Sequence, residues 1–252
     1  MCISIRASIN SFLIATLSSI ALIFFGNKEL YAYNLIIAGI FIFVSLMQLV
    51  DLGMWIDLDC KIGTNKLASI LGPVLNWFQP TAIFIIIYLV IKYTKSGRKL
   101  YKNKTSNLNK KYPILNHFDI NSNNFNLIKL LNIGYAIVVM LLLVSYYKKA
   151  YTSPSMLCTG VKYGHLSWNW YTKMNTFYIG IIWHITLINL LSLNFKNPLI
   201  LFTIGITYVF LLASLAYKSS VAEVWCYLVN FVPLIMLILQ KVFPRLMKRN
   251  LQ

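Results

Sequence analysis

Between Asn34 and Ile56 the chain reads NLIIAGIFIFVSLMQLVDLGMWI, an apolar run whose one charged residue is Asp51. About 20 mainly apolar residues in a helix suffice to cross the roughly 30 Å hydrocarbon core of a bilayer. The run therefore predicts a membrane-spanning helix. Because it is continuously apolar and does not alternate with polar residues, it also argues against a β-barrel strand.

The composition of the whole chain agrees with this interpretation. The 252 residues are 58% hydrophobic and 12% charged, whereas a soluble domain carries about 25% charged residues. Seven stretches have the length and character of spans: Ala7–Phe25, Asn34–Ile56, Leu67–Ile91, Phe125–Tyr147, Asn175–Leu193, Pro198–Tyr217 and Val221–Gln240. We expect an all-α bundle of seven transmembrane helices forming one domain over residues 1–252. The first stretch is expected to be retained, because Phe24-Phe25-Gly26 offers no signal-peptidase site.

The distribution of the basic residues predicts the orientation of the bundle in the membrane. The 23 Lys and Arg exceed the 6 Asp and Glu, giving a net charge of +17. The loop 92–124 is rich in them, with Lys92, Lys95, Arg98, Lys99, Lys102 and Lys104 near its start. Four more lie in the tail, so the positive-inside rule places this loop and the carboxyl terminus in the cytoplasm and the amino terminus outside.

The spacing of the lysines at 92, 95, 99 and 102 predicts that the third helix continues beyond the membrane as a charged ridge. Such a ridge attracts anionic lipid headgroups by about 1 kcal/mol per basic residue near the surface. Orientation of the chain alone explains the charges equally well. Nucleic acid is not expected as a partner, because no recognised binding motif accompanies the charge.

The outer loops carry two cysteines and many aromatic residues. Cys60 and Cys158 fall on the same, non-cytoplasmic face, so they form either a disulfide or two free thiols. The loop 148–174 contains Tyr151, Tyr163, Trp168, Trp170 and Tyr171. We expect these rings to anchor the loop at the lipid headgroups. The alternative is that they form a lid over a ligand.

Polar residues within the spans are costly in lipid and so mark candidate sites. Gln48, Asp51 and Trp55 share one face of the second helix, because they are three and four residues apart. In the third span, Asn76 and Gln79 precede Pro80, which removes a backbone donor and predicts a kink.

Further candidates are His184 in the fifth expected span and Glu223 and Asn230 in the last one. With those of the second and third spans they could line one polar cavity that opens outward. Alternatively, each makes a hydrogen bond that joins two helices. No metal ligand set or catalytic residue is evident, and no cofactor is expected.

The string SLMQLVD from Ser45 to Asp51, followed by Trp55, resembles an element of an uncharacterised family of multi-pass membrane proteins of large DNA viruses and some protists. Gln79-Pro80 and Glu223-Val-Trp225-Cys226 are also similar to that family. Its members usually carry Glu where this chain has Asp51, which keeps the carboxylate but shortens its reach. The resemblance implies a host endomembrane or virion membrane and no known activity.

Known motifs for nucleotide binding, hydrolysis and redox chemistry are missing from the sequence. The predicted last span has no lysine for retinal, and the DRY and NPxxY motifs of G-protein-coupled receptors are not found. We therefore expect a small transporter, channel or ligand-binding membrane protein whose ligand is a small molecule or ion. The alternative is a non-catalytic protein that organises a membrane or binds a partner through its basic loop. An enzyme ranks third.

The orientation is testable at the sequon Asn103-Lys104-Thr105, which lies in the basic loop. We expect no glycan there when the chain is inserted into microsomes, because the loop faces the cytoplasm. A mobility shift that a glycosidase reverses would contradict the orientation.

Overall fold

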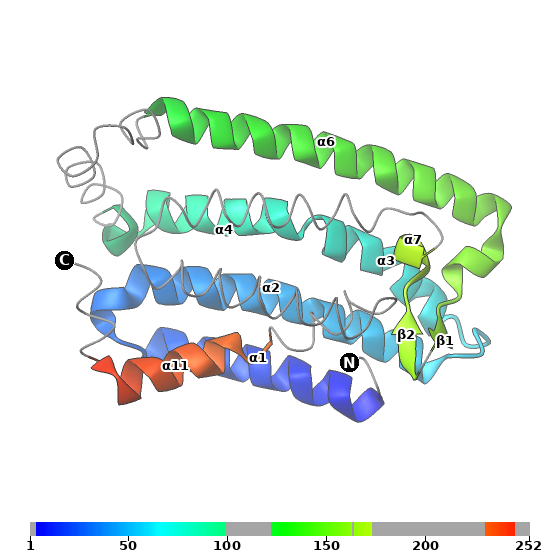
Figure 1. Cartoon of the computed structure of the whole chain (residues 1–252), viewed down its shortest axis with the longest axis horizontal. Helices are drawn as coiled ribbons and strands as arrows, with labels where there is room; N and C mark the ends of the chain where they lie inside the picture. Colours follow the sequence, from blue (N-terminus) through cyan, green and yellow to red (C-terminus); the bar gives the residue numbers. More distant parts are fainter. Residues whose placement is uncertain (1–3, 99–121, 163, 173–229, 245–252) are drawn as a thin grey trace.

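The computed structural model describes residues 4–98, 122–162, 164–172 and 230–244. Its long helices lie side by side with their axes roughly parallel (Figure 1). The short elements of residues 154–162 and 164–172 lie together at one end of the bundle, and we call them the cap. In chain order the described elements are α1 (Ile5–Phe25), η1 (Lys28–Leu30), α2 (Tyr31–Ile56), α3 (Thr64–Trp77), α4 (Gln79–Tyr93), α6 (Ser122–Thr152), η3 (Pro154–Leu157), β1 (Gly160–Lys162), β2 (His165–Ser167), α7 (Asn169–Thr172) and α11 (Val232–Val242).

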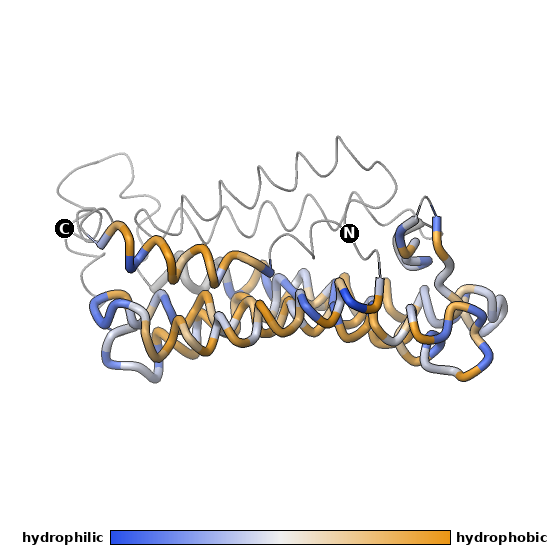
Figure 2. The backbone as a smooth tube through the Cα atoms, turned by 90° about the horizontal axis from the view of Figure 1, so that it is seen from below, coloured by the Kyte–Doolittle hydropathy of each residue, from blue (hydrophilic) through white to orange (hydrophobic). Residues whose placement is uncertain are grey.

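Three of the described helical segments are long and apolar enough to cross a membrane: Ile5–Phe25, Lys28–Ile56 and Lys129–Thr152. The bent pair α3–α4 adds a fourth if it is one span. Figure 2 shows apolar residues along the helices and hydrophilic residues mainly at the two ends of the bundle. The described part confirms the mainly helical class, with one small β1–β2 hairpin. The expected spans 175–193 and 198–217, and the start of 221–240, lie outside the described residues.

Two apolar clusters fill the interior between the helices. One joins α1, α2, α4 and α11 through residues such as Leu22, Phe41 and Met236. The other joins α2, α3, α6 and the cap, and it includes Met47 and Val139. The second cluster includes Met47, Val50 and Met54, which neighbour Gln48 and Asp51 along α2, together with Trp168 and Trp170 of the cap.

The helix of the third span breaks where the sequence predicts. α3 ends at Trp77, α4 begins at Gln79, and the two axes differ by 54°. Pro80 lies at the start of α4, where its missing N–H is not needed by the helix. The Tyr135 hydroxyl of α6 donates a 2.6 Å hydrogen bond to the carbonyl of Trp77. A side chain from a neighbouring helix therefore satisfies a backbone group at the break.

The prediction that the third helix continues as a charged ridge is wrong, because the helix is interrupted at Thr94. α4 ends at Tyr93, and Thr94 is extended with φ −105° and ψ 144° before the chain is helical again over 95–98. The Thr94 hydroxyl donates to the carbonyl of Val90 at 2.7 Å and accepts from the amide of Gly97 at 2.9 Å. It thus ends one helix and caps the next, as threonine does at an N-cap. Lys99, Lys102 and Lys104 lie outside the described residues.

At the end of the bundle away from the cap, polar side chains tie α11 to the turn between α1 and α2. Gln240 donates to the Oδ1 of Asn34 at 2.7 Å and accepts from the amide of Asn27 at 2.8 Å. The Asn34 amide in turn donates to the Asn27 carbonyl at 3.2 Å. These buried groups satisfy one another, which buried polar groups require.

Candidate intramembrane polar site

The register between α2 and the α3–α4 pair sets which polar residues face each other. The helices run antiparallel, and a Cβ on Gly53 would lie 3.2 Å from the Cβ of Ala68. A Cβ on Gly39 would lie 3.0 Å from the Cγ2 of Ile86. Between these two contacts, Gln48 of α2 falls close to the level of Asn76 in the last turn of α3.

The polar residues of the second and third spans are all buried. The exposed fraction is 0% for Gln48 and Asp51, 3% for Asn76 and 1% for Gln79. A buried position is what the cost of polar groups in hydrocarbon demands. The predicted set from these two spans therefore lies inside the protein, on both sides of the helix break.

Asp51 is bonded to the cap. The indole N–H of Trp168 donates a 2.9 Å hydrogen bond to Oδ1 of Asp51, across 117 residues of sequence. Trp168 stacks on Trp170 with ring centroids 5.0 Å apart, and both side chains are fully buried. Trp170 in turn lies against Gly72 of α3, where a Cβ would overlap the Cη2 of its ring.

This geometry corrects the expectation that the loop tryptophans anchor the protein at the headgroups. For Trp168 and Trp170 that prediction is wrong, because both are buried against α2 and α3. The physical reason is the carboxylate of Asp51, which gives the Trp168 indole a strong acceptor inside the protein. Tyr151, by contrast, is 89% exposed.

Gln48 differs from the other buried amides of the bundle. Neither its Oε1 nor its Nε2 has a hydrogen-bond partner among the residues that the structure describes. The indole nitrogen of Trp55, on the same face of α2, also has none. Leaving a buried polar group unpaired costs about 1–3 kcal/mol. On the face of α2 that carries Asp51, Gln48 therefore has an unpaired donor and an unpaired acceptor about one helical turn before Asp51.

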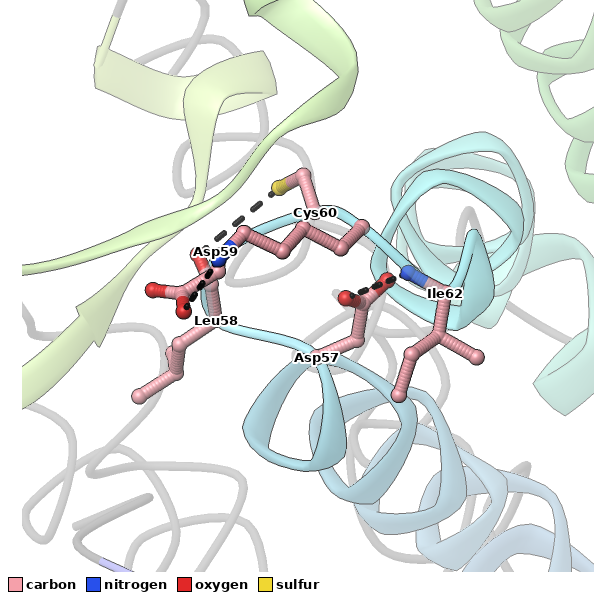
Figure 3. Close-up of polar contacts among 6 residues, drawn as sticks. Asp57, Leu58, Asp59, Cys60 and Ile62 are labelled. Atoms are coloured by element: carbon pink, nitrogen blue, oxygen red, sulfur yellow. Dashed lines mark hydrogen bonds and ion pairs between the residues drawn. The ribbon is translucent and has the colours of Figure 1, made fainter.

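A disulfide and a tight turn hold the cap over this face. Cys60 and Cys158 form the disulfide, so the structure selects one of the two states that the sequence left open. In the turn before α3, the Asp57 carboxylate accepts from the amides of Ile62 at 3.0 Å, Gly63 at 2.7 Å and Asn65 at 3.2 Å. Figure 3 shows Asp57 reaching across the turn to the Ile62 amide. The hydrogen bond from Ile62, with those from the other amides, lowers the pKa of the Asp57 carboxyl below its usual value.

Asn65 forms the second attachment of the cap. Its side chain donates to the carbonyl of Thr159 and accepts from the Thr159 amide, both at 2.9 Å. Tyr146 of α6 donates its hydroxyl to the carbonyls of Ser69 and Met156 at 3.1 and 3.3 Å. Sequence reasoning missed these residues, because a single Asn or Tyr near a helix end gives no sign of a partner about 90 residues away.

The remaining predicted site residues divide into two groups. Asn230, in the turn before α11, donates to the Ser11 hydroxyl of α1 at 2.8 Å, the kind of structural hydrogen bond that the alternative predicts. His184 and Glu223 lie outside the described residues. Within the described ranges no three His, Cys, Asp or Glu side chains gather as a metal site would require.

No protein-family model matches the chain, and no curated protein or solved structure is significantly similar to it. The resemblance to the viral and protist membrane proteins therefore stays a prediction. The function has to be argued from the geometry of the site.

The bond between Asp51 and Trp168 can be measured by a double-mutant cycle. Trp168→Phe and Asp51→Leu, which removes the acceptor, should each destabilise the protein, with a coupling free energy of about 1.5–3 kcal/mol, the range for hydrogen bonds to charged groups. Reversible unfolding in mixed micelles gives the free energies. Trp55→Phe is the matched control, since its indole nitrogen has no hydrogen-bond partner among the described residues, and it should show no coupling to Asp51→Leu. Coupling near zero for Trp168 would contradict the bond.

The contact between Trp170 and α3 predicts that alanine substitutions at two glycines change the stability of the protein in opposite directions. Gly72→Ala should destabilise by about 1–3 kcal/mol, because the added Cβ overlaps the buried ring. Gly134→Ala on α6 meets nothing within 4 Å and should stabilise by about 0.5–1 kcal/mol through helix propensity. The same unfolding assay compares them, and equal effects would show that Trp170 does not pack on Gly72.

Proposed function

We propose that this chain is a multi-pass membrane protein that binds a small polar ligand between α2, the α3–α4 break and the cap, in the manner of a transporter, channel or receptor. The observation that carries the proposal is the Gln48 amide, which is fully buried with both of its polar atoms unpaired. A protein has no structural gain from such a group. Such a group is useful to the protein when it binds a ligand reversibly.

The surroundings of Gln48 support a binding site over a simple packing defect. Asp51 lies one turn away on the same face, and its bond to Trp168 links the interior to a separately attached cap. The break at Phe78 interrupts the neighbouring helix at about the same depth. In transporters, interrupted helices at membrane depth occur where the backbone lines a binding site.

The proposal includes the topology that the sequence suggests. The cap, with its disulfide, faces the oxidising side of the membrane, and the basic loop after α4 faces the cytoplasm. Seven spans, with the amino terminus outside, remain part of the proposal. The cap then closes the site on the outer side.

The competing function is that of a membrane-organising protein acting through its basic loop. Lys92 lies 5.4 and 5.2 Å from the ring centroids of Tyr88 and Tyr93, at the end of α4. Such an arrangement suits a lysine at a membrane surface. Under this alternative the face of α2 at Gln48 is a packed interior that solutes never reach.

Substituted cysteines separate the two functions without a known ligand. In a chain whose Cys2 and Cys226 are changed to Ser, Gln48→Cys in proteoliposomes should react with a charged methanethiosulfonate reagent, since openings of the cap admit water to the site. The matched control is Leu49→Cys, because Leu49 is 42% exposed on the outer face of the described bundle and a thiol in hydrocarbon forms little thiolate.

We expect the thiol at position 48 to react at least about tenfold faster than the thiol at 49, a difference of about 1.4 kcal/mol in barrier. Protein yield and unfolding should be similar for the two variants. Equal rates, or no reaction at position 48, would contradict the binding function and favour the organising one.

A further inference from the structure

We propose that the seam between α1, α2 and α11 is a path for water across the protein and that the side chain of Leu22 closes it. By the seam we mean the buried face of α1 together with the residues of α2 and α11 that pack against it. This inference goes beyond the proposed binding function, because it concerns permeation along a whole helix. It rests on that proposal for the membrane-spanning topology.

The buried face of α1 consists almost entirely of small and polar residues. The buried residues of this helix are Ser8, Ser11, Ala15, Ser18, Ser19 and Leu22. The opposite face carries large apolar residues such as Leu13 and Leu17, which are 45% and 62% exposed. Small residues also let two helices pack closely within a membrane. The serines indicate a path only in combination with a second observation.

That second observation is that hydroxyl and amide groups in the seam lack partners. Ser8 and Ser19 are 1% and 0% exposed, and neither hydroxyl has a hydrogen-bond partner among the described residues. Asn230 is completely buried and donates its Nδ2 to Ser11 on this face, while its Oδ1 has no partner in the described part of the chain. Close packing does not require such groups, whereas water molecules readily bond to them.

The polar groups extend along the seam and are not confined to one point. Ser8 and Ser19 are 11 residues apart on α1, which is about 16 Å along a helix and about half of the roughly 30 Å hydrocarbon core. Between them the hydroxyls of Thr16 and Ser45 lie 3.5 Å apart across the seam. Gln48 lies three residues from Ser45 on α2, so the proposed binding site borders the seam.

Polar groups resume at the inner end of α1. Gln240 of α11 bonds both Asn34 and the amide of Asn27, at 2.7 and 2.8 Å. A Cβ on Gly26 would lie 2.5 Å from the Nδ2 of Asn34, so these amides lie directly against the end of α1. Between Ser19 and this cluster, the buried face of α1 carries Leu22 alone.

Leu22 is therefore placed to close the path. It is 0% exposed and belongs to the apolar cluster that includes Ile37 of α2 and Met236 of α11. A short apolar constriction in a polar path excludes water by dewetting. Because the unpaired polar atoms of the seam are covered in this structure, the structure represents the closed form.

Osmotic water permeability of the full chain in proteoliposomes tests the path, measured from vesicle shrinkage after a hyperosmotic shock. The natural sequence should conduct little water. Leu22→Ser should raise the permeability per protein at least about fivefold, because a hydroxyl at the constriction lets water wet it. The matched control is Leu17→Ser, which makes the same change on the exposed face of α1 and should have no effect.

A second apolar residue should close the opened path again. Ser19 lies three residues before Leu22 on the same buried face. Adding Ser19→Leu to Leu22→Ser should therefore return the permeability to the natural level.

A thiol measurement tests the seam with Leu22 in place. In a chain whose Cys2 and Cys226 are changed to Ser, Ser19→Cys replaces a hydroxyl by a thiol of similar size. Its reaction with a charged methanethiosulfonate reagent should be at least about tenfold faster than that of Leu17→Cys, since a thiol in hydrocarbon forms little thiolate.

Two results would overturn the inference. One is a folded Leu22→Ser variant that conducts no more water than Leu17→Ser, and the other is a thiol at position 19 that reacts no faster than the thiol at 17. If Leu22→Ser does not fold, the thiol measurement decides alone. A reactive thiol at position 48 together with an unreactive one at 19 refutes the path and leaves the binding function standing. The reverse pattern refutes the binding function and supports the path.

Discussion

The hydrogen bond from Trp168 to Asp51 is the interaction on which the cap end of the described structure depends. A carboxylate buried in an apolar helical bundle needs a donor, and the chain brings one from 117 residues away. To deliver that donor the cap must fold back over the ends of α2 and α3. The disulfide and the paired hydrogen bonds of Asn65 with Thr159 hold it there. These two attachments hold the chain at residues 158 and 159, and the bond of Trp168 to Asp51 holds the part of the cap that follows.

Other features follow from the position of the tryptophan pair. Trp170 stacks on Trp168 and needs the space that Gly72 leaves on α3. One turn beyond Gly72 lies Asn76, next to the break that precedes Pro80. The cap therefore closes a polar region that extends from Asp51 inward to Gln48. At that inner end the protein itself satisfies neither atom of the amide, and this unfilled hydrogen-bonding capacity is the basis of the proposed function.

The sequence predicted those parts of the fold and site that local patterns encode. Apolar runs located α1, α2, α4 and α6, Pro80 located the break, and a spacing of three placed Gln48 and Asp51 on one face. It could not predict that Trp168 bonds Asp51, because a long-range partner leaves no local signature and aromatic residues near a membrane usually lie at its surface. The end of α4 at Thr94 was missed for another reason. The lysine spacing continues through it, while the hydroxyl that stops the helix is a single side chain.

Hydrogen–deuterium exchange of the full chain tests the central claim that Asp51 holds the cap through Trp168. The backbone amides of 158–170 are compared between the natural sequence and Trp168→Phe, with the amides of 27–34, at the other end of the bundle, as the internal reference. We expect faster exchange in the cap of the variant and unchanged exchange in the reference turn, which Asn34 and Gln240 stabilise away from the cap. Unchanged exchange in both segments would show that the cap does not depend on this bond and would contradict the account.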